Sequence, residues 1–241
     1  KRLKWPDDYF TLSQQLSYQN YDLDNWSSTF AFSDGSSNTI SLTETFARNS
    51  IDQPIYPRKG AQISLTLQLT PPYSFFDGIE DYSSLTSQEK YKWSEFHKWK
   101  FKLSWFTALA GKLVLNTRVQ YGFLGRYNNK LDVTPFERFT VGGSGLSGFN
   151  LYGTEVIALR GYPDNSLSPS TGSTIFNKYT FELRYPLSLN PSATIYGMAF
   201  TEAGNAWNGF DEFKPFDIKR SAGLGVRIFL PMFGLLGFDY A

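Results

Sequence analysis

The chain has 241 residues, and its 23 basic and 22 acidic side chains leave a formal net charge of +1. That balance argues against a nucleic-acid partner, which requires a basic surface. The chain holds no cysteine and a single histidine, His97, so disulfides, thiolate metal sites and histidine-cluster metal sites are excluded. The single histidine also rules out most histidine-based catalysis.

Aromatic side chains are the unusual part of the composition. Phe, Tyr and Trp make up 18% of the chain, with 22 Phe, 15 Tyr and 6 Trp. A soluble core does not need so many, whereas a transmembrane β-barrel carries aromatic girdles at both membrane interfaces. No run of about 18 apolar residues occurs, so no transmembrane helix is expected. The mean hydropathy of -0.32 fits a barrel, because half of each strand faces a polar lumen.

Apolar and polar residues alternate with a period of two along much of the chain. This alternation predicts pleated strands with one apolar and one polar face. The segments run roughly 9–14 residues, the span that a tilted strand needs to cross a bilayer. The clearest cases are residues 63–70, 113–121, 179–185 and 222–228. They place Arg118, Glu182, Arg184 and Arg227 in mid-strand on polar faces.

About ten strands are predicted in chain order. They span residues 8–23, 39–50, 61–71, 93–109, 112–126, 136–142, 174–187, 193–203, 220–230 and 234–241. A helix of at most a turn or two is expected within 85–90. Tight turns at 109–112 and 187–191 alternate with long connections around 73–92 and 143–173, as in outer-membrane barrels. No linker divides the chain, so residues 1–241 are predicted to be one domain.

Three short motifs suggest specific chemistry, but each has a simpler structural explanation. Residues 143–148 match the dinucleotide fingerprint G-x-G-x-x-G, but no helix start follows, so a flexible glycine-rich loop is favoured. Residues 87–90 match S-x-x-K of penicillin-binding enzymes without the companion motifs, so a solvated loop is favoured. His97 lies among Trp93, Phe96 and Trp99 and is expected in an interfacial aromatic cluster.

Arg160 allows two readings. By composition, residues 159–165 are an ordinary turn with a solvated arginine. Alternatively, the guanidinium binds carboxylates as a forked donor inside the barrel. A buried arginine would need such partners, because an unpaired buried charge is expensive. Glu182 and Glu202 on the following strands are the candidate lumenal partners.

Several segments, in their order along the chain, resemble the BamA family of outer-membrane assembly barrels, of a Bacteroidetes-like type, and its wider superfamily. Arg160-Gly161-Tyr162 looks like the family's R-G-F/Y motif on a long loop that folds back into the barrel. Residues 136–143 look like the strand that leads into this loop. Residues 202–207 are similar to the strand end D-x-G-x-x-W. The other similar segments are Trp5 to Phe10, Tyr56 to Gly60, Ser221 to Arg227 and Phe238 to Ala241.

The resemblance implies an all-β fold, a transmembrane antiparallel barrel of about sixteen strands behind periplasmic domains. This chain would be a partial C-terminal barrel, roughly strands six to fifteen, without counterparts of the first strands, the last strand and the periplasmic domains. Its two cut edges would need partners in lipid, either from more of the same chain, which we favour, or from another polypeptide. The implied function is folding and inserting β-barrel proteins into the outer membrane of a Gram-negative bacterium, without covalent chemistry. The resemblance therefore implies no metal, no cofactor and no catalytic residues. The implied partners are unfolded barrel clients, accessory assembly lipoproteins and outer-membrane lipids. Arg160, paired with Glu182 and Glu202, would lock the loop inside the barrel, with Gly161 and Tyr162 completing the motif.

Two features depart from the family pattern. An insert at about 145–158 separates the glycine pair from the arginine motif. Glu202 stands where an aspartate is usual and shares its face with Tyr196, Met198 and Phe200, so either the lumen is aromatic there or a bulge resets the alternation. A protein-translocating pore of two-partner secretion type is the alternative function. An outer-membrane phospholipase is a weaker option, because no serine pairs with His97 in the sequence.

Overall fold

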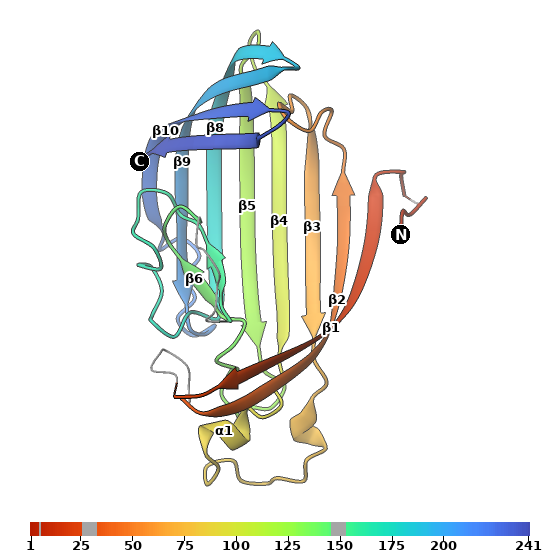
Figure 1. The fold of residues 1–241 in the computed structure, drawn as a ribbon, viewed down its shortest axis with the longest axis vertical. Helices are drawn as coiled ribbons and strands as arrows, with labels where there is room; N and C mark the ends of the chain where they lie inside the picture. The colour runs from red at the N-terminus through yellow and green to blue at the C-terminus, as the bar shows by residue number, and fades with distance from the viewer. Residues whose placement is uncertain (5, 26–32, 146–152) are drawn as a thin grey trace.

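The computed structural model describes residues 1–4, 6–25, 33–145 and 153–241. Nine antiparallel strands form one long sheet, and two short parallel strands form a second one (Figure 1). The long sheet runs in the order β1 (Phe10–Leu23), β2 (Gly35–Asn49), β3 (Gly60–Leu69), β4 (His97–Ala108), β5 (Val114–Gly125), β8 (Ile175–Asn190), β9 (Ala193–Trp207), β10 (Lys219–Leu230) and β11 (Gly234–Tyr240). The short strands are β6 (Phe139–Val141) and β7 (Glu155–Ile157).

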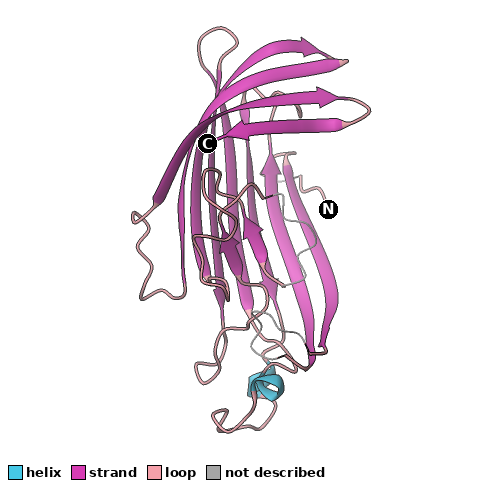
Figure 2. Cartoon of the chain, turned by 60° about the vertical axis from the view of Figure 1, so that its left-hand side comes forward, coloured by secondary structure: helices cyan, strands magenta, loops and turns pink. Residues whose placement is uncertain are grey.

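The long sheet curves strongly and stays open, with β1 and β11 as its two edges (Figure 2). It is therefore part of a barrel wall, and its concave side is called the lumen below. Alternation along β8 places Phe181, Leu183 and Tyr185 outward and exposed, while Thr180 and Glu182 are buried on the lumenal side. On β8 the polar-in, apolar-out pattern expected from the sequence is confirmed.

Residues 136–142 do not form a wall strand, so that prediction was wrong. Only Phe139–Val141 are extended, and they pair with β7 in the lumen rather than with the long sheet. All three residues are buried, because protein surrounds β6 on both faces. The other expected strands are confirmed within a few residues, although β9 continues to Trp207 and β8 continues past the expected turn to Asn190.

Three of the four connections at one end of the sheet are short, at residues 109–113, 191–192 and 231–233, and the fourth, residues 50–59, has ten residues. At the other end, the long-loop end, the connections are residues 24–34, 70–96, 126–174 and 208–218, each of eleven residues or more, so the expected difference between the two ends is confirmed. The single turn of helix α1 (Ser87–Lys90) and the 3-10 turn η1 (Tyr73–Phe75) lie at the long-loop end (Figure 1). No helix in the described part of the chain has the length and apolarity to span a membrane.

Two apolar clusters fill the lumen at different heights along the strands. The cluster nearer the long loops contains Phe96, Leu124, Phe139, Val141, Ile157, Leu159 and Phe176. The cluster nearer the short turns contains Tyr56, Phe106, Val114 and Tyr196. On β5 and β8 the lumen-facing side chains between these heights are polar or charged. The charged layer therefore lies between two apolar layers, which limit its contact with water.

Candidate functional site

The long connection between β5 and β8 folds back against the lumenal side of the sheet (Figures 1 and 2). β6 is its centre, paired on one side with β7 and on the other, through Phe139, with Ser173. Phe139 and Leu159 are fully buried against wall residues. The connection is thus a packed element of the lumen, which we call the lumenal loop.

Arg160 lies in this loop and points at three carboxylates from three strands. Its Nη2 donates to Glu182 Oε1 at 2.9 Å and to Glu202 Oε1 at 2.8 Å. Its Nη1 lies 3.4 Å from Asp239 Oδ2. Its backbone N–H donates to Glu202 Oε2 at 2.8 Å, and the guanidinium carbon stands 3.5 Å from the centroid of the Phe200 ring. The solvated reading of Arg160 is wrong, because its side chain is only 9% exposed.

Glu182 on β8 binds more cations than any other carboxylate of the described residues. Its Oε1 accepts from Arg160 and from Arg118 of β5, and its Oε2 accepts from Arg184 Nε at 3.0 Å. Asn116 Nδ2 adds a contact of 3.3 Å to Oε2. With 1% of its surface exposed, Glu182 can remain charged only because these donors replace water.

Glu202 on β9 also faces the lumen. Lys178 Nζ lies 3.0 Å from Glu202 Oε1, and Thr180 Oγ1 donates to the same oxygen at 3.3 Å. Between residues 196 and 202 the register of β9 with β8 and β10 is unbroken, so no bulge resets the alternation there. Of the two alternatives, the aromatic lumen is confirmed: Tyr196 and Phe200 are buried on the same face as Glu202.

Asp239 on β11 is a member of the site that the sequence analysis did not identify. Arg227 of β10 binds both of its oxygens, at 2.8 and 2.7 Å. Gly225 of β10 leaves room for the Asp239 carboxylate, because a Cβ at this position would lie 2.2 Å from Asp239 Oδ1. Lys178 was also missed, although it shares the lumenal face of β8 with Glu182 and that parity was a usable signal.

The two other motif residues both approach β10. Gly161 has φ of +85°, and a Cβ on it would lie 2.9 Å from Ser221 Cβ, so only glycine fits easily. Tyr162 OH donates to the carbonyl of Arg220 at 2.9 Å. Each residue of Arg160-Gly161-Tyr162, the latch motif, therefore has a separate contact with the wall.

The latch motif and its partners form a lumenal ion cluster with more cations than carboxylates. Its ion-paired members are the cations Arg118, Arg160, Lys178, Arg184 and Arg227 and the carboxylates Glu182, Glu202 and Asp239. Five positive and three negative charges leave an excess of two positive charges. Such an arrangement fixes positions, and none of its members is paired as a nucleophile with a base. Within the described residues, no group of three His, Cys, Asp or Glu side chains could hold a metal ion.

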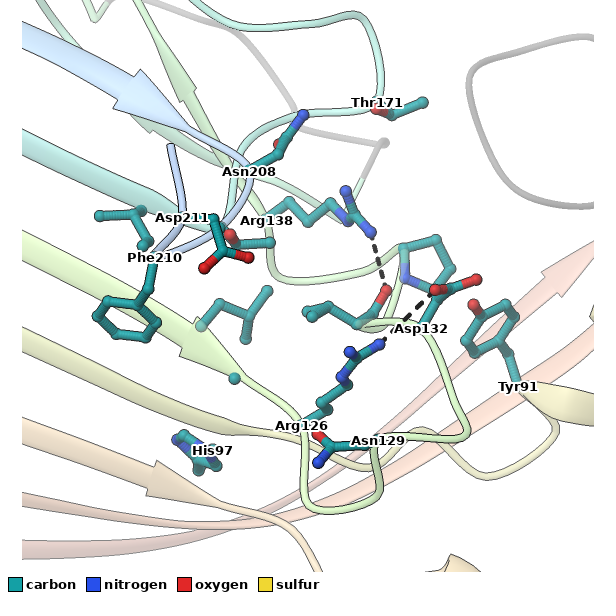
Figure 3. A pocket seen from close by; sticks show the side chains of 17 residues that line it. Tyr91, His97, Arg126, Asn129, Asp132, Arg138, Thr171, Asn208, Phe210 and Asp211 are labelled. Carbon is teal, nitrogen blue, oxygen red and sulfur yellow. Dashed lines mark hydrogen bonds and ion pairs between the residues drawn. The ribbon is translucent and has the colours of Figure 1, made fainter. Parts of the chain in front are cut away.

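A pocket at the long-loop end is separate from this cluster (Figure 3). Its two arginines are held by backbone carbonyls: Arg138 donates to Val133 and Thr134, and Arg126 donates to Leu131. His97 at its rim accepts from Trp99 Nε1 at 3.1 Å and packs against the Tyr127 ring. Of the aromatic neighbours expected for His97, Trp93 packs against Tyr73 and Phe96 lies in the apolar lumenal cluster instead. The pocket thus lacks an activated nucleophile in the described residues.

Of the two remaining motifs, residues 87–90 lie at the surface as expected, and the glycine-rich motif is described only in its first half. Residues 87–90 are a surface turn capped by Thr86, whose side chain accepts from Glu89 N at 3.3 Å. Gly143 N donates to the carbonyl of Tyr162 at 3.0 Å, so this glycine belongs to the fold of the lumenal loop. The second half of the glycine-rich motif, residues 146–148, and Trp5 of the N-terminal motif lie outside the described residues.

Comparison with known proteins agrees with this architecture. Among solved structures, the chain is similar to BamA from Haemophilus ducreyi lacking POTRA domains 1-3, with a TM-score of 0.67 and 16% identity. The alignment covers 98% of this chain and 48% of that one, so the chain spans about half its length. At this identity the likeness establishes the barrel fold. A search of curated proteins found no match. The Omp85 superfamily domain matches residues 3–241, and the chain therefore belongs to the Omp85 superfamily of outer-membrane assembly and translocation barrels.

Proposed function

We propose that this chain is the partial barrel domain of an assembly factor that folds and inserts β-barrel proteins into the outer membrane of a Gram-negative bacterium. The observation that carries the proposal is the lumenal loop held by Arg160 among Glu182, Glu202 and Asp239. The clients would be unfolded outer-membrane barrels, assisted by accessory lipoproteins. The exposed apolar outer face, for example Phe181 and Leu183, supports contact with outer-membrane lipids.

In this proposal the latch motif keeps the loop inside the barrel while the wall rearranges. Arg160, Glu182 and Glu202 at the centre of the ion cluster are each less than 10% exposed, so the charge-assisted hydrogen bonds between them are stronger than at a surface. Client strands would pair with an exposed strand edge of the complete barrel, as in strand addition generally. No covalent step is needed, since strand pairing and burial in lipid supply the driving force.

The proposal includes further parts of the same polypeptide. Edges β1 and β11 each pair with one neighbour in the described sheet, and an open edge is not tolerated in lipid. We propose that upstream periplasmic domains, the first strands and the last strand complete the molecule. The full reading frame tests this directly: a frame that encodes no additional barrel strands contradicts it.

Depletion of the protein in its own bacterium tests the function. We expect the folded, heat-modifiable forms of many outer-membrane barrels to fall together while their unfolded precursors accumulate in the periplasm. A translocating pore would give a different result: normal barrel levels and a single exported substrate trapped in the periplasm. That second outcome would replace the assembly proposal with the alternative function.

The latch is tested in full-length protein with Arg160→Ala. We expect reduced barrel assembly and stability in cells, with strand content retained, because each wall strand keeps its own pairing. Arg126→Ala is the matched control, since this arginine of the same loop is 35% exposed and lies 3.7 Å from its carboxylate. Normal growth and unchanged heat-modifiable migration of Arg160→Ala would refute the role.

A further inference from the structure

The lumenal loop makes a second set of ion pairs, on β4, in which the charges are reversed. Here the wall supplies the cations and the loop supplies the carboxylates. Lys98 Nζ lies 2.9 Å from Glu137 Oε2 and 3.0 Å from Glu155 Oε2. Lys100 Nζ lies 3.0 Å from the same oxygen of Glu155. We call these four residues the β4 cluster.

Lys98 lies in a site built to hold a buried cation. Its side chain is 1% exposed, and its Nζ is 4.8 Å from the centroid of the Phe139 ring. Gly122 on the neighbouring strand allows that ring to come close, because a Cβ there would lie 2.7 Å from Phe139 Cζ. A buried ammonium is unfavourable without charged partners, so both loop carboxylates are required parts of this site.

The two loop carboxylates are fixed by the backbone around them. Glu137 has φ of +66°, a left-handed conformation that persists in a non-glycine residue only where surrounding contacts enforce it. Glu155 N donates to the carbonyl of Arg138 at 2.7 Å, and the pairing of β7 with β6 continues from there. Glu155 belongs to the insert at 145–158, so the insert contributes both a strand and a charge to the lumen.

We propose that the β4 cluster is a second anchor of the lumenal loop, which positions β6 and β7 independently of Arg160. Among the described residues, no ion pair joins the β4 cluster to the lumenal ion cluster. Each anchor therefore holds its own part of the loop, and loss of both is needed to expose both parts. The inference rests on the proposed function only in taking the loop as an element that must stay in the lumen.

Hydrogen exchange of the purified full-length protein tests the second anchor. Glu155→Gln keeps the shape of the side chain and removes its charge. We expect exchange in peptides of β6 and β7 to rise about tenfold, while the segment around Arg160 stays protected. Arg160→Ala should give the converse pattern, and the double variant should expose both segments. Lys102→Gln is the control, because this exposed lysine follows Lys100 on the same face of β4 and has no ion pair in the described residues.

A cross-link separates anchoring from a general folding defect. The chain has no cysteine, so Lys100→Cys with Glu155→Cys offers one thiol pair for a short bifunctional reagent. Cross-linking should restore the protection that the pair of substitutions removes. Unchanged exchange in Glu155→Gln, or equal loss of protection at Arg160, would overturn the second anchor. Neither result bears on client assembly, so the proposed function would fail or stand by its own depletion test.

Discussion

Replacing Glu182 by glutamine should destabilise the barrel more than removing Arg160, although Arg160 is the residue that marks the family motif. The reason is the charge balance of the lumenal ion cluster, with five cations and three carboxylates. Loss of Arg160 lowers the positive excess from two charges to one. Loss of the Glu182 charge raises it to three and leaves Arg118 and Arg184 without their carboxylate.

The expected losses in the free energy of unfolding depend on which charged groups of the ion cluster keep a partner after each substitution. Breaking a buried ion pair from one side costs about 3–5 kcal/mol, and Glu182 is 1% exposed with three guanidinium partners. We therefore expect Glu182→Gln to lower the free energy of unfolding by about 4 kcal/mol. After Arg160→Ala every carboxylate keeps a cation and no buried charge is left unpaired, so the loss of the Arg160 hydrogen bonds and of its contact with Phe200 should cost less, about 2 kcal/mol.

Unfolding of the full-length protein in urea, followed by tryptophan fluorescence and by heat-modifiable migration, measures both values. Glu44→Gln on β2 is the control, because within the described residues that carboxylate forms no ion pair and accepts one exposed hydrogen bond, from Gln14. We expect this substitution to change the free energy of unfolding by less than about 0.5 kcal/mol. An Arg160→Ala variant that is clearly less stable than Glu182→Gln would refute the reasoning from charge balance.

Three further predictions concern packing, lipid contact and pH. Gly122→Ala should cost about 1–3 kcal/mol in urea unfolding, because its Cβ would lie 2.2 Å from Phe176 Cε1, whereas Gly209→Ala, with open space, should cost little. Phe181→Arg on the exposed outer face should cost about 2–4 kcal/mol for a barrel folded into lipid vesicles if its site lies at the bilayer midplane, and less nearer an interface. Burial raises the pKa of Tyr56 from 10.0 to about 12. The protonated phenol therefore contributes fully to the free energy of unfolding below pH 10, and this contribution is lost as the pH rises towards 12. Tyr56→Phe should remove the corresponding part of the loss of stability at alkaline pH.

Alternation along single strands made the wall predictable from sequence. Glu182 could be placed in the lumen because its neighbours Phe181 and Leu183 are apolar and must face outward. The same rule failed for residues 136–142, because a strand inside the lumen is covered on both faces and shows no contrast between them. A run of buried residues does not reveal whether it belongs to a wall or to a loop that fills it.

The partners of Arg160 were only partly predictable, for a different physical reason. Glu202 could be proposed from the motif, but its face remained ambiguous until the register of β9 with β8 and β10 was known. Asp239 meets Arg160 across 79 residues of sequence and only through the pairing of β10 with β11. Such contacts depend on register and sheet curvature, which a local pattern does not contain.

The lumenal loop carries opposite charges at its two anchors, and these charges define its orientation in the lumen. At Arg160 the loop is positive and meets carboxylates of β8, β9 and β11, whereas at Glu155 it is negative and meets lysines of β4. A loop turned end for end would place Glu155 beside Glu182 and Arg160 beside Lys98, and both contacts would be repulsive in a water-poor lumen. Apolar packing through Phe139 and Leu159 favours burial of the loop without specifying its direction. Hydrophobic burial alone would allow several orientations of the loop, and the ion pairs select one of them. This selection accounts for buried charges of both signs at positions where apolar side chains could be buried at a lower cost in free energy.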